Sequence, residues 1–575
     1  MFSYKIKSIK FKNNTEIKLG CINVFVGANN CGKTQLLKDL LNLVTGNNKS
    51  NILISEIEDI FPNSFNEIEM TCEEDIKKID NKEQLIYIQP ELNDGCVTFD
   101  GNDIKDYILK HFEHNDKNFL RQKFGSGIIK YLKTDTRLSL TNNCKIKDPM
   151  RIGATNLMEA ILLLDEKSMD TFKSKIKNIL NVAVEMDKSS LNTLKMRIGD
   201  DFSKISKDFK LAHKEFEKYA LLDDQGDGMR SIIGIISALI AVKRPITLLD
   251  EPEAFLHPPQ AIQLGQCISE LIDKDQQIFI ATHSADFLRG LLSSTKDAVI
   301  IHMDRSANNE MDINILDSGT LNEIIYNPIL SSSRVLEGMF YKGVVITEAD
   351  ADSTFYQRAF QNIGAADEIH FVHAHNKQTI KKLLIPYEKL GIKHAAITDI
   401  DIIREEQDLK NLITMADVNL QSIILQNRLK ILENIQKRSK SELLNNLLSK
   451  IHEISKIPSF KEEESESILI SLKRELKKIC KESNEFSELK KSGYRALSGE
   501  TLEAFNNLYE NCTSIGLFIV KVGELESWLD DYNYPRLSDK SKWITGALEK
   551  IFDMTPDRNK ELWKFIYELK DYLIN

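Results

Sequence analysis

The 575-residue sequence lacks several features that mark specialised classes of protein. Its eight cysteines include no Cys-x-x-Cys pair, so their spacing indicates neither a zinc site nor a disulfide framework. The longest apolar run, Ser231–Val242, is too short to cross a bilayer about 30 Å thick. The opening residues, MFSYKIKSIKFK, alternate charged and apolar side chains and contain no continuous apolar stretch of the signal-peptide kind. We therefore expect a cytoplasmic protein with no membrane partner.

An excess of positive charge is also missing. The net charge is −10, which argues against a surface coated with basic side chains. Any contact with nucleic acid must then come from local clusters of lysine and arginine. Hydrophobic residues make up 42% and charged residues 28%, as in ordinary globular proteins. Because single cores rarely grow beyond about 250–300 residues, the length predicts two or more domains.

A phosphate-binding loop is the first motif along the chain. An apolar stretch over Cys21–Val26 predicts a strand, and leucines at helical spacing follow from Leu36. Between them, residues 27–34 read GANNCGKT, a full match to G-x-x-x-x-G-K-[ST] in its strand–loop–helix setting. Backbone N–H groups and the helix N-terminus would surround a phosphate there. The residues expected to contact ATP in this loop are Gly27, Asn30, Gly32, Lys33 and Thr34.

Later motifs complete a nucleotide site, in which Thr34 is also expected to bind Mg²⁺. The apolar strand Ile246–Leu249 ends in Asp250 and Glu251. Asp250 suits magnesium binding, and Glu251 is placed to act as the general base for hydrolysis. A further strand ends at His283, which is expected to reach the γ-phosphate.

A second glycine-bearing segment, GDGMRS, precedes those two strands. It opens the apolar helix that contains the longest apolar run, and a glycine loop at a helix N-terminus can bind an anion. The residues of this segment expected to contact nucleotide are Gly228 and Ser231.

The order of these motifs resembles the ATP-binding-cassette (ABC) class of ATPases, in particular its SMC and RecF-like branch. The resemblance covers roughly residues 1–330. It implies that two subunits share each ATP, with the GDGMRS segment of one closing on the nucleotide of the other. Residues 50–220 are expected to hold antiparallel strands and a helical arm. Within them, Arg137 in YLKTDTRL either faces nucleotide or DNA or lies on a solvated charged strand, and we favour the solvated strand.

Two acidic clusters follow apolar strands in the second half of the chain. Glu348 and Asp352 follow the apolar run that begins at Gly343, and Asp399 and Asp401 follow the apolar run Ala395–Ile397. Strands of a parallel sheet bring such residues to one edge, where carboxylates can bind Mg²⁺ or Mn²⁺. A cluster of this kind is commonly just a helix cap in a solvated turn. Two clusters about fifty residues apart favour a metal site.

These segments resemble the TOPRIM domain of topoisomerases, primases and certain nucleases. The closer resemblance is to the OLD (overcoming lysogenisation defect) family, in which an ABC-type ATPase precedes a TOPRIM nuclease; VVITEADADSTFY, HNKQTIKKLL, AAITDID and GLFIVKVGELESWL are similar to its segments. The resemblance implies metal binding by Glu348, Asp352, Asp399, Asp401 and Glu526, with Glu524 as the alternative to Glu526. Glu348 and Asp399 would then be catalytic. It also implies a catalytic lysine, for which we favour Lys542 over Lys540.

The expected fold class is α/β, with an ABC-type ATPase domain over residues 1–335 and a TOPRIM domain over residues 336–575. Residues 404–512 are predicted to form a helical insertion. Apolar residues at helical spacing within 425–456 predict an amphipathic helical hairpin. Its lysine-rich face is either a DNA or partner contact or a solvated helix face, and we favour the solvated face.

The function expected from these resemblances is that of an ATP-regulated, metal-dependent DNA endonuclease. Resemblance to OLD-type effectors, including those of Gabija and retron systems, implies a role in antiphage defence. The expected partners are DNA, a second or further copies of the chain, and a reverse transcriptase with its RNA–DNA hybrid or a helicase. The alternative is a nucleotide-gated DNA-binding or scaffold ATPase with an inactive TOPRIM domain. A strand-passing topoisomerase is disfavoured because no tyrosine domain accompanies the TOPRIM segments.

Overall fold

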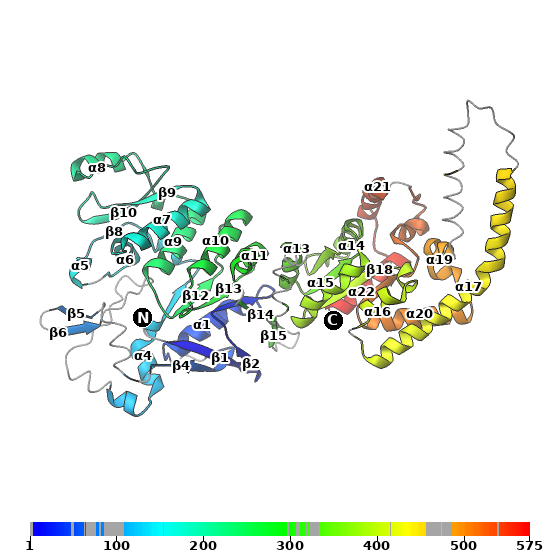
Figure 1. Cartoon of the computed structure of the whole chain (residues 1–575), viewed down its shortest axis with the longest axis horizontal. Helices are drawn as coiled ribbons and strands as arrows, with labels where there is room; N and C mark the ends of the chain where they lie inside the picture. Colours follow the sequence, from blue (N-terminus) through cyan, green and yellow to red (C-terminus); the bar gives the residue numbers. More distant parts are fainter. Residues whose placement is uncertain are drawn as a thin grey trace. The chain divides into compact units, whose positions relative to one another are not determined.

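The chain divides into two compact units, Met1–Phe340 and Tyr341–Asn575, in a computed structural model (Figure 1). Each unit contains its own parallel sheet. The structure describes residues 4–47, 51–62, 64, 76–79, 82–85, 109–152, 154–295, 298–305, 311–316, 320, 324, 333–414, 416–455, 473, 486–537 and 540–574. No helix in these ranges is both long and apolar enough to cross a membrane.

The first unit is built around a six-stranded sheet. Five strands run parallel and the edge strand β15 runs antiparallel to them. Its strands, in order across the sheet, are β15 (Met311–Leu316), β14 (Ala298–Arg305), β3 (Ile22–Val26), β13 (Gln277–Ala281), β12 (Ile246–Asp250) and β7 (Ile129–Leu132). All residues of β3, β12 and β13 are buried, as expected for central strands covered on both faces. The carboxyl ends of these three strands therefore meet at one edge of the sheet.

Helices and smaller sheets cover this central sheet. Helix α1 packs its leucines between the central sheet and the antiparallel sheet β2–β1–β4, and α10 and α11 lie side by side (Figure 1). The smaller sheets contain β1 (Lys5–Phe11), β2 (Glu16–Lys18) and β4 (Ile54–Ile60); β8 (Cys144–Lys145), β9 (Ala183–Asp187), β10 (Thr193–Gly199) and β11 (Ala220–Leu221); and β5 (Ile76–Ile79) and β6 (Lys82–Leu85). The helices are α1 (Lys33–Val44), α4 (Lys117–Ile128), α5 (Pro149–Ile152), α6 (Leu157–Leu162), α7 (Glu166–Leu180), α8 (Phe209–Phe216), α9 (Asp227–Ala241), α10 (Pro258–Leu271), α11 (Ala285–Ser294) and α13 (Ser333–Glu337).

The second unit has a four-stranded, fully parallel sheet. Its strands, in order, are β17 (Ile369–His373), β16 (Gly343–Thr347), β18 (Lys393–Asp399) and β19 (Leu517–Val520). Because β16 and β18 are parallel neighbours, the residues that follow them lie at the same edge. The helices are α14 (Asp350–Asn362), α15 (Lys377–Lys389), α16 (Glu406–Leu412), α17 (Val418–Ser455), α19 (Ser487–Ser492), α20 (Glu500–Ser514), α21 (Lys540–Phe552) and α22 (Glu561–Ile574). The two parallel sheets with their helices confirm the predicted α/β class.

The hairpin predicted within residues 425–456 is wrong. The structure has a single helix there, α17, of 38 residues. No glycine or proline occurs between residues 418 and 455, so nothing in the backbone favours a break. The predicted apolar face is also misplaced, because Leu429 is 48% exposed while Arg428 is buried. Residues 456–472 and 474–485 lie outside the described residues, as do the side chains of Leu444, Leu447, Ile451 and Ile454 on which the hairpin prediction also relied.

Buried aromatic side chains form the core of the second unit. Trp528 is 2% exposed, and its ring lies 4.9 Å from that of Phe565. Its indole N–H donates a hydrogen bond to the Tyr356 hydroxyl at 2.9 Å. Tyr356 lies on α14, so this contact connects the helix that follows β16 with the segment that follows β19. The core therefore holds in place two of the segments that carry acidic residues.

Trp528→Ala should destabilise the second unit by about 3–5 kcal/mol, because it removes a buried aromatic ring and a hydrogen bond. The first unit has its own core, so its stability should persist. Calorimetry of the full chain should show one thermal transition shifted downward and the other unchanged. Phe552→Ala, which alters a 64% exposed ring, is the matched control and should change little. An equal downward shift of every transition would contradict the separate cores.

Candidate nucleotide and metal sites

The loop between β3 and α1 adopts a backbone that requires its glycines. Gly27 has φ 144°, and a Cβ there would lie 2.1 Å from the Met303 carbonyl oxygen. Gly32 is the N-cap of α1 with φ 103°. Asn30 also has a left-handed backbone, with φ 65°. These conformations turn the loop tightly against the edge of the sheet, as a phosphate cradle requires.

Lys33 is folded back onto its own loop. Its ammonium group donates hydrogen bonds to the carbonyls of Gly27 and Ala28, both at 2.9 Å, and lies 3.4 Å from the Cys31 sulfur. Burial lowers the pKa of Lys33. Its two closest acceptors are uncharged carbonyls, so a phosphate would be a stronger partner for the same donor. The residues of this loop therefore fit a nucleotide phosphate.

Thr34 and Asp250, predicted to bind magnesium, lie together. The Thr34 hydroxyl donates to Asp250 Oδ1 at 3.0 Å, and the Tyr131 hydroxyl donates to Oδ2 at 3.2 Å. Burial raises the pKa of the Asp250 carboxyl. A hydroxyl and a carboxylate at the end of the phosphate loop are suitable donors for Mg²⁺, so this pair fits that ion.

Glu251 and His283 are also neighbours, as expected from β12 and β13 being adjacent strands. His283 Nε2 lies 3.6 Å from Glu251 Oε1. Burial, together with the charge of Lys33, lowers the pKa of His283 to about 4, so this imidazole is neutral at pH 7. The sequence did not single out Glu253, whose carboxylate accepts a hydrogen bond from the His283 backbone N–H at 2.7 Å. Burial raises the pKa of this carboxyl as well.

The favoured prediction that Arg137 lies on a solvated strand is wrong. Arg137 begins the 3-10 helix η1 (Arg137–Ser139), and its side chain is fully buried. Its guanidinium donates to the Ser231 hydroxyl at 2.8 Å and to the carbonyls of Asp250 and Glu251, both at 2.7 Å. Burial lowers its pKa to about 10. The sequence that follows strand β7 gave no indication that this arginine would be buried. One buried cation thus connects the GDGMRS helix with the Asp-Glu segment.

Of the two nucleotide contacts predicted in GDGMRS, Ser231 is buried within its own unit and Gly228 is partly buried. The Ser231 hydroxyl is buried against Arg137. At Gly228 on α9, a Cβ would lie 2.5 Å from the Phe255 carbonyl oxygen. A close backbone approach therefore accounts for this glycine.

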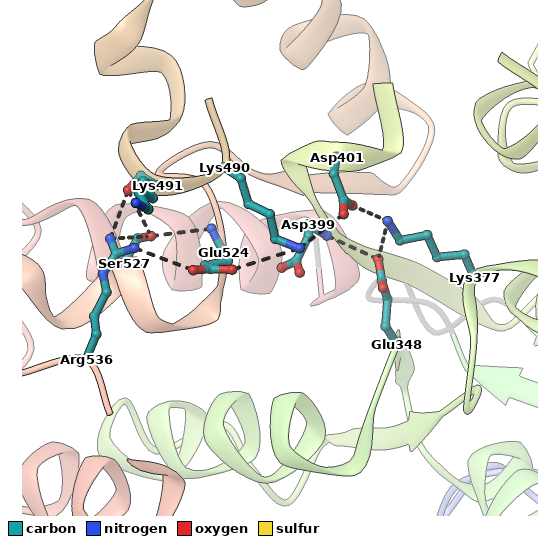
Figure 2. A network of polar contacts seen from close by, with 9 residues as sticks. All are labelled: Glu348, Lys377, Asp399, Asp401, Lys490, Lys491, Glu524, Ser527 and Arg536. Carbon is teal, nitrogen blue, oxygen red and sulfur yellow. Dashed lines mark hydrogen bonds and ion pairs between the residues drawn. The ribbon is translucent and has the colours of Figure 1, made fainter. Parts of the chain in front are cut away.

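Acidic side chains converge at the carboxyl edge of the second sheet (Figure 2). Glu348 follows β16, Asp399 ends β18, and Asp401 lies in the following 3-10 turn η4 (Ile400–Ile403). Glu348 Oε1 accepts a hydrogen bond from the Asp399 backbone N–H at 3.2 Å. Asp352 accepts from the Ala349 backbone N–H at 3.1 Å and so caps α14. The structure brings together the first three acids. Asp352 has the helix-cap role that the sequence left open, and its charge also acts on Glu348 and Asp399.

Burial and mutual repulsion disfavour charge on these acids. Burial raises the pKa of Glu348 to about 7. Burial, followed by the charge of Glu348, raises the pKa of Asp399 well above its usual value. Burial acts in the same direction on Asp401, but the hydrogen bond and charge of Lys377, aided by Lys490, lower its pKa. For Glu348 and Asp399, the nearby positive charge therefore does not offset burial and repulsion, and their pKa values stay raised.

Two lysines that the sequence did not assign to the site lie among the acids. The Lys377 ammonium hydrogen-bonds Asp401 and lies 3.8 Å from Glu348 Oε1. The Lys490 ammonium lies 3.3 Å from Asp401 Oδ2 and 3.9 Å from Glu524 Oε2. Lys377 begins the helix after β17, so its place at this edge could have been predicted. Lys490 lies on α19, beyond the long helix α17, and no local pattern points to it.

The acid and the lysine predicted late in the chain lie outside the group formed by Glu348, Asp399 and Asp401. Glu524 contacts Lys490 and lies 3.5 Å from Arg536 Nη1, as Figure 2 shows. Glu526 is 7% exposed, within the 3-10 helix η7 (Leu525–Tyr532). Lys542 is exposed on α21 and is not part of the network drawn in Figure 2. The side chain of the alternative, Lys540, lies outside the described residues.

The donor chemistry of this acid cluster fits a hard divalent cation, because its ligands would all be carboxylate oxygens. As the side chains stand, however, the described residues contain no group of three His, Cys, Asp or Glu side chains that could hold a metal ion. Lys377 bridges Glu348 and Asp401 and provides positive charge between them. The cluster therefore has the carboxylate groups that a divalent cation would need, and lysine ammonium groups lie among them.

Two parts of the chain match known protein families. Residues 150–289 match the family described as AAA domain, putative AbiEii toxin, Type IV TA system. This match contains Asp250, Glu251 and His283. Residues 339–401 match the overcoming lysogenization defect protein-like TOPRIM domain. This match contains Glu348 and Asp399.

Two curated proteins are similar to the chain at low identity. The OLD nuclease of Thermus scotoductus is 24% identical over 320 residues, which cover 49% of this chain and 58% of that protein. Protein ea59 of Escherichia phage lambda is 25% identical over 276 residues, covering 46% of this chain and 45% of that protein. The chain thus spans about half of the length of these curated relatives.

Parts of some solved structures are also similar to the chain. An SMC head bound to the C-winged helix domain of ScpA is 12% identical, with 54% of this chain and 97% of that chain covered and a TM-score of 0.32. The ADP conformation of an ATP-binding cassette of an ABC transporter is 13% identical, with 58% and 99% covered and a TM-score of 0.24. At these TM-scores the similarity supports no further conclusion.

The family matches agree with the two sites in their order along the chain: an ATPase domain comes first and a TOPRIM domain follows. The chain therefore combines an AAA/ABC-like ATPase domain with an OLD-like TOPRIM domain, and it has distant homology to the OLD nuclease and to protein ea59.

Proposed function

We propose that this protein is an ATP-regulated, divalent-metal-dependent DNA endonuclease. In this proposal residues 1–335 form the ATPase domain and residues 336–575 the nuclease domain. The observation that carries it is the convergence of Glu348, Asp399 and Asp401 at the carboxyl edge of a parallel sheet. Carboxyls with strongly raised pKa values at such an edge are expected where a cation binds. The name of the Thermus scotoductus relative, OLD nuclease, supports the same activity.

The acids would hold Mg²⁺ or Mn²⁺. Glu348, Asp352, Asp399 and Asp401 are the proposed ligands, and Glu526 is a further one. Bound cations would supply an activated water and stabilise the leaving oxygen. The nearby lysines would offset the negative charge of the DNA backbone, and Lys542 is proposed to stabilise the charge on the reacting phosphate.

In the first unit, Lys33 and Thr34 would bind the nucleotide phosphates, with Gly27, Asn30 and Gly32 shaping the loop around them. Asp250 would bind the Mg²⁺ that accompanies ATP. Glu251 would accept the proton of the attacking water. His283, which is neutral at pH 7, can form one hydrogen bond through Nε2 to a phosphate or water.

The proposal also includes the assembly of the protein and its biological role. A dimer or tetramer would let Gly228 and Ser231 of one subunit approach the nucleotide of another, after Ser231 exchanges its bond with Arg137. The resemblance to Gabija-type and retron-associated effectors supports antiphage defence. It also supports, as a partner, a helicase or a reverse transcriptase with its RNA–DNA hybrid.

One observation favours a second candidate, a nucleotide-gated DNA-binding or scaffold ATPase whose TOPRIM domain is inactive. Lys377 and Lys490 already neutralise part of the acidic cluster, so the cluster has a structural role that needs no metal. The two candidates differ in whether the acids support cleavage.

Glu348→Gln and Asp399→Asn should each reduce DNA cleavage at least about 100-fold, because the site then cannot hold divalent cations. ATP hydrolysis should remain close to normal, since these acids belong to the second unit. Plasmid cleavage with Mg²⁺ or Mn²⁺, with and without ATP, provides the measurement. Asp367→Asn, an exposed acid of the same unit, is the control. Cleavage by both site variants at the parental rate would overturn the assignment, and a parent inert under every metal would favour the scaffold ATPase.

Lys33→Ala should abolish tight ATP binding, whereas Glu251→Gln should bind ATP but hydrolyse it about 10²–10⁴-fold more slowly. Only the second variant leaves the phosphate cradle intact. Binding of a fluorescent ATP analogue and phosphate release should be measured on both proteins. The exposed Lys243→Ala is the control. Normal turnover by Glu251→Gln would show that another group acts as the base.

Glu348→Gln should stabilise the metal-free protein above pH 7 and leave it unchanged below pH 4.5. The folded-state pKa of Glu348 is about 7 against a usual 4.5, so folding retains a proton that the unfolded chain loses. Stability is therefore lost as pH rises from 4.5 to 7, by up to about 3 kcal/mol. Urea unfolding in a chelator at pH 5 and pH 8 measures the difference. A stabilisation that is equal at both pH values would contradict the raised pKa.

A further inference from the structure

Lys490 is the most accessible cation in contact with the acidic cluster. It lies on the short helix α19, and its side chain is 42% exposed, compared with 23% for Lys377. Figure 2 shows its ammonium group between Asp401 and Glu524 and beside the carboxylate of Asp399. Burial acts to lower the pKa of Lys490, but the charges of Asp401 and Asp399 outweigh it and raise the pKa.

The contacts of Lys490 conflict with those that a divalent cation would need. Asp401 Oδ2 lies 3.3 Å from the Lys490 ammonium, while Oδ1 accepts from Lys377. Both oxygens of this carboxylate are therefore engaged by lysines. A divalent cation that binds Asp401 would lie close to an ammonium group, and the repulsion between the two positive charges favours displacement of a lysine. Lys490 can move outward on its four-carbon stem because part of its side chain already faces solvent.

A displaced Lys490 would lie beside the place where the phosphate backbone of a substrate must come. An ammonium group binds phosphate as a point charge and gains one charge-assisted hydrogen bond or more. The loss of its acid partners would thus be offset by a new anionic partner. Lys377 is less suited to this exchange, since it is held between Asp401 and Glu348 in the first turn of α15.

We propose that Lys490 exchanges partners: it neutralises Asp401 and Glu524 in the metal-free protein, and cation binding releases it to contact a phosphate of the DNA. This inference rests on the proposed function and specifies how the metal site and the DNA site are coupled. Lys490 competes with the cation and cooperates with the DNA. Its removal should therefore change the two affinities in opposite directions.

The test is Lys490→Met in the full-length protein, with Mn²⁺ binding followed by electron paramagnetic resonance in the absence of nucleotide. The Mn²⁺ dissociation constant should fall about three- to tenfold, since a competing cation at a partly exposed ion pair is lost. DNA binding should be measured in Ca²⁺ on an uncleaved duplex. Its dissociation constant should rise, and the slope of log affinity against log salt should shrink by about 0.9, the value for one phosphate contact.

Two further variants control this test. Lys491→Met removes the neighbouring ammonium; Lys491 contributes its backbone carbonyl to the network, accepting from Arg536 Nη2 at 2.8 Å. This variant should leave Mn²⁺ affinity unchanged. Lys490→Arg retains the charge and should stay close to the parent in both affinities.

Opposite changes in the two affinities would support the exchange, because a merely structural role for Lys490 would weaken both. Unchanged or weaker Mn²⁺ binding by Lys490→Met would overturn it. An unchanged salt slope would overturn the phosphate contact. If the Asp399→Asn protein binds Mn²⁺ as tightly as the parent protein does, the proposed metal site itself fails. That result is distinct from failure of the exchange.

Discussion

Repulsion among partly buried carboxylates is the constraint on which the second unit depends. The parallel pairing of β16 and β18 brings Glu348 and Asp399 to one edge, where burial opposes the charge of both. An isolated buried charge is costly unless an opposite charge compensates for it. Lys377 and Lys490 provide part of that compensation from two separate helices. The remaining imbalance is what a divalent cation would correct.

The first unit uses a buried cation for a different purpose. Arg137 holds the carbonyls of Asp250 and Glu251 and the hydroxyl of Ser231, so three segments distant in sequence share one guanidinium. Glu251 has φ 44°, an uncommon backbone conformation for a residue with a side chain. The guanidinium bond to its carbonyl helps hold that conformation. The orientation of the proposed general base thus depends on a residue that contacts it only through the backbone.

The helices between β18 and β19 have a direct physical connection to the acidic cluster. Arg428 on α17 donates to the carbonyls of Ile403 and Arg404, just after Asp401. Lys490 on α19 contacts Asp401 itself. Two of these helices therefore meet the segment that carries Asp401. A change in either helix would reach the proposed metal site through these contacts.

Local patterns in the sequence were sufficient for the α/β class, the phosphate loop and the acids at the strand ends. Each depends on residues within one strand–loop–helix segment, and strand ends in a parallel sheet meet at a common edge. The burial of Arg137 and the position of Lys490 among the acids were decided by tertiary structure. These features depend on which distant segments pack together. A sequence pattern alone does not show which charged side chains will find partners in the fold: Arg137 is buried against Ser231, which lies 94 positions away, and Lys490 contacts Asp401 across 89 positions.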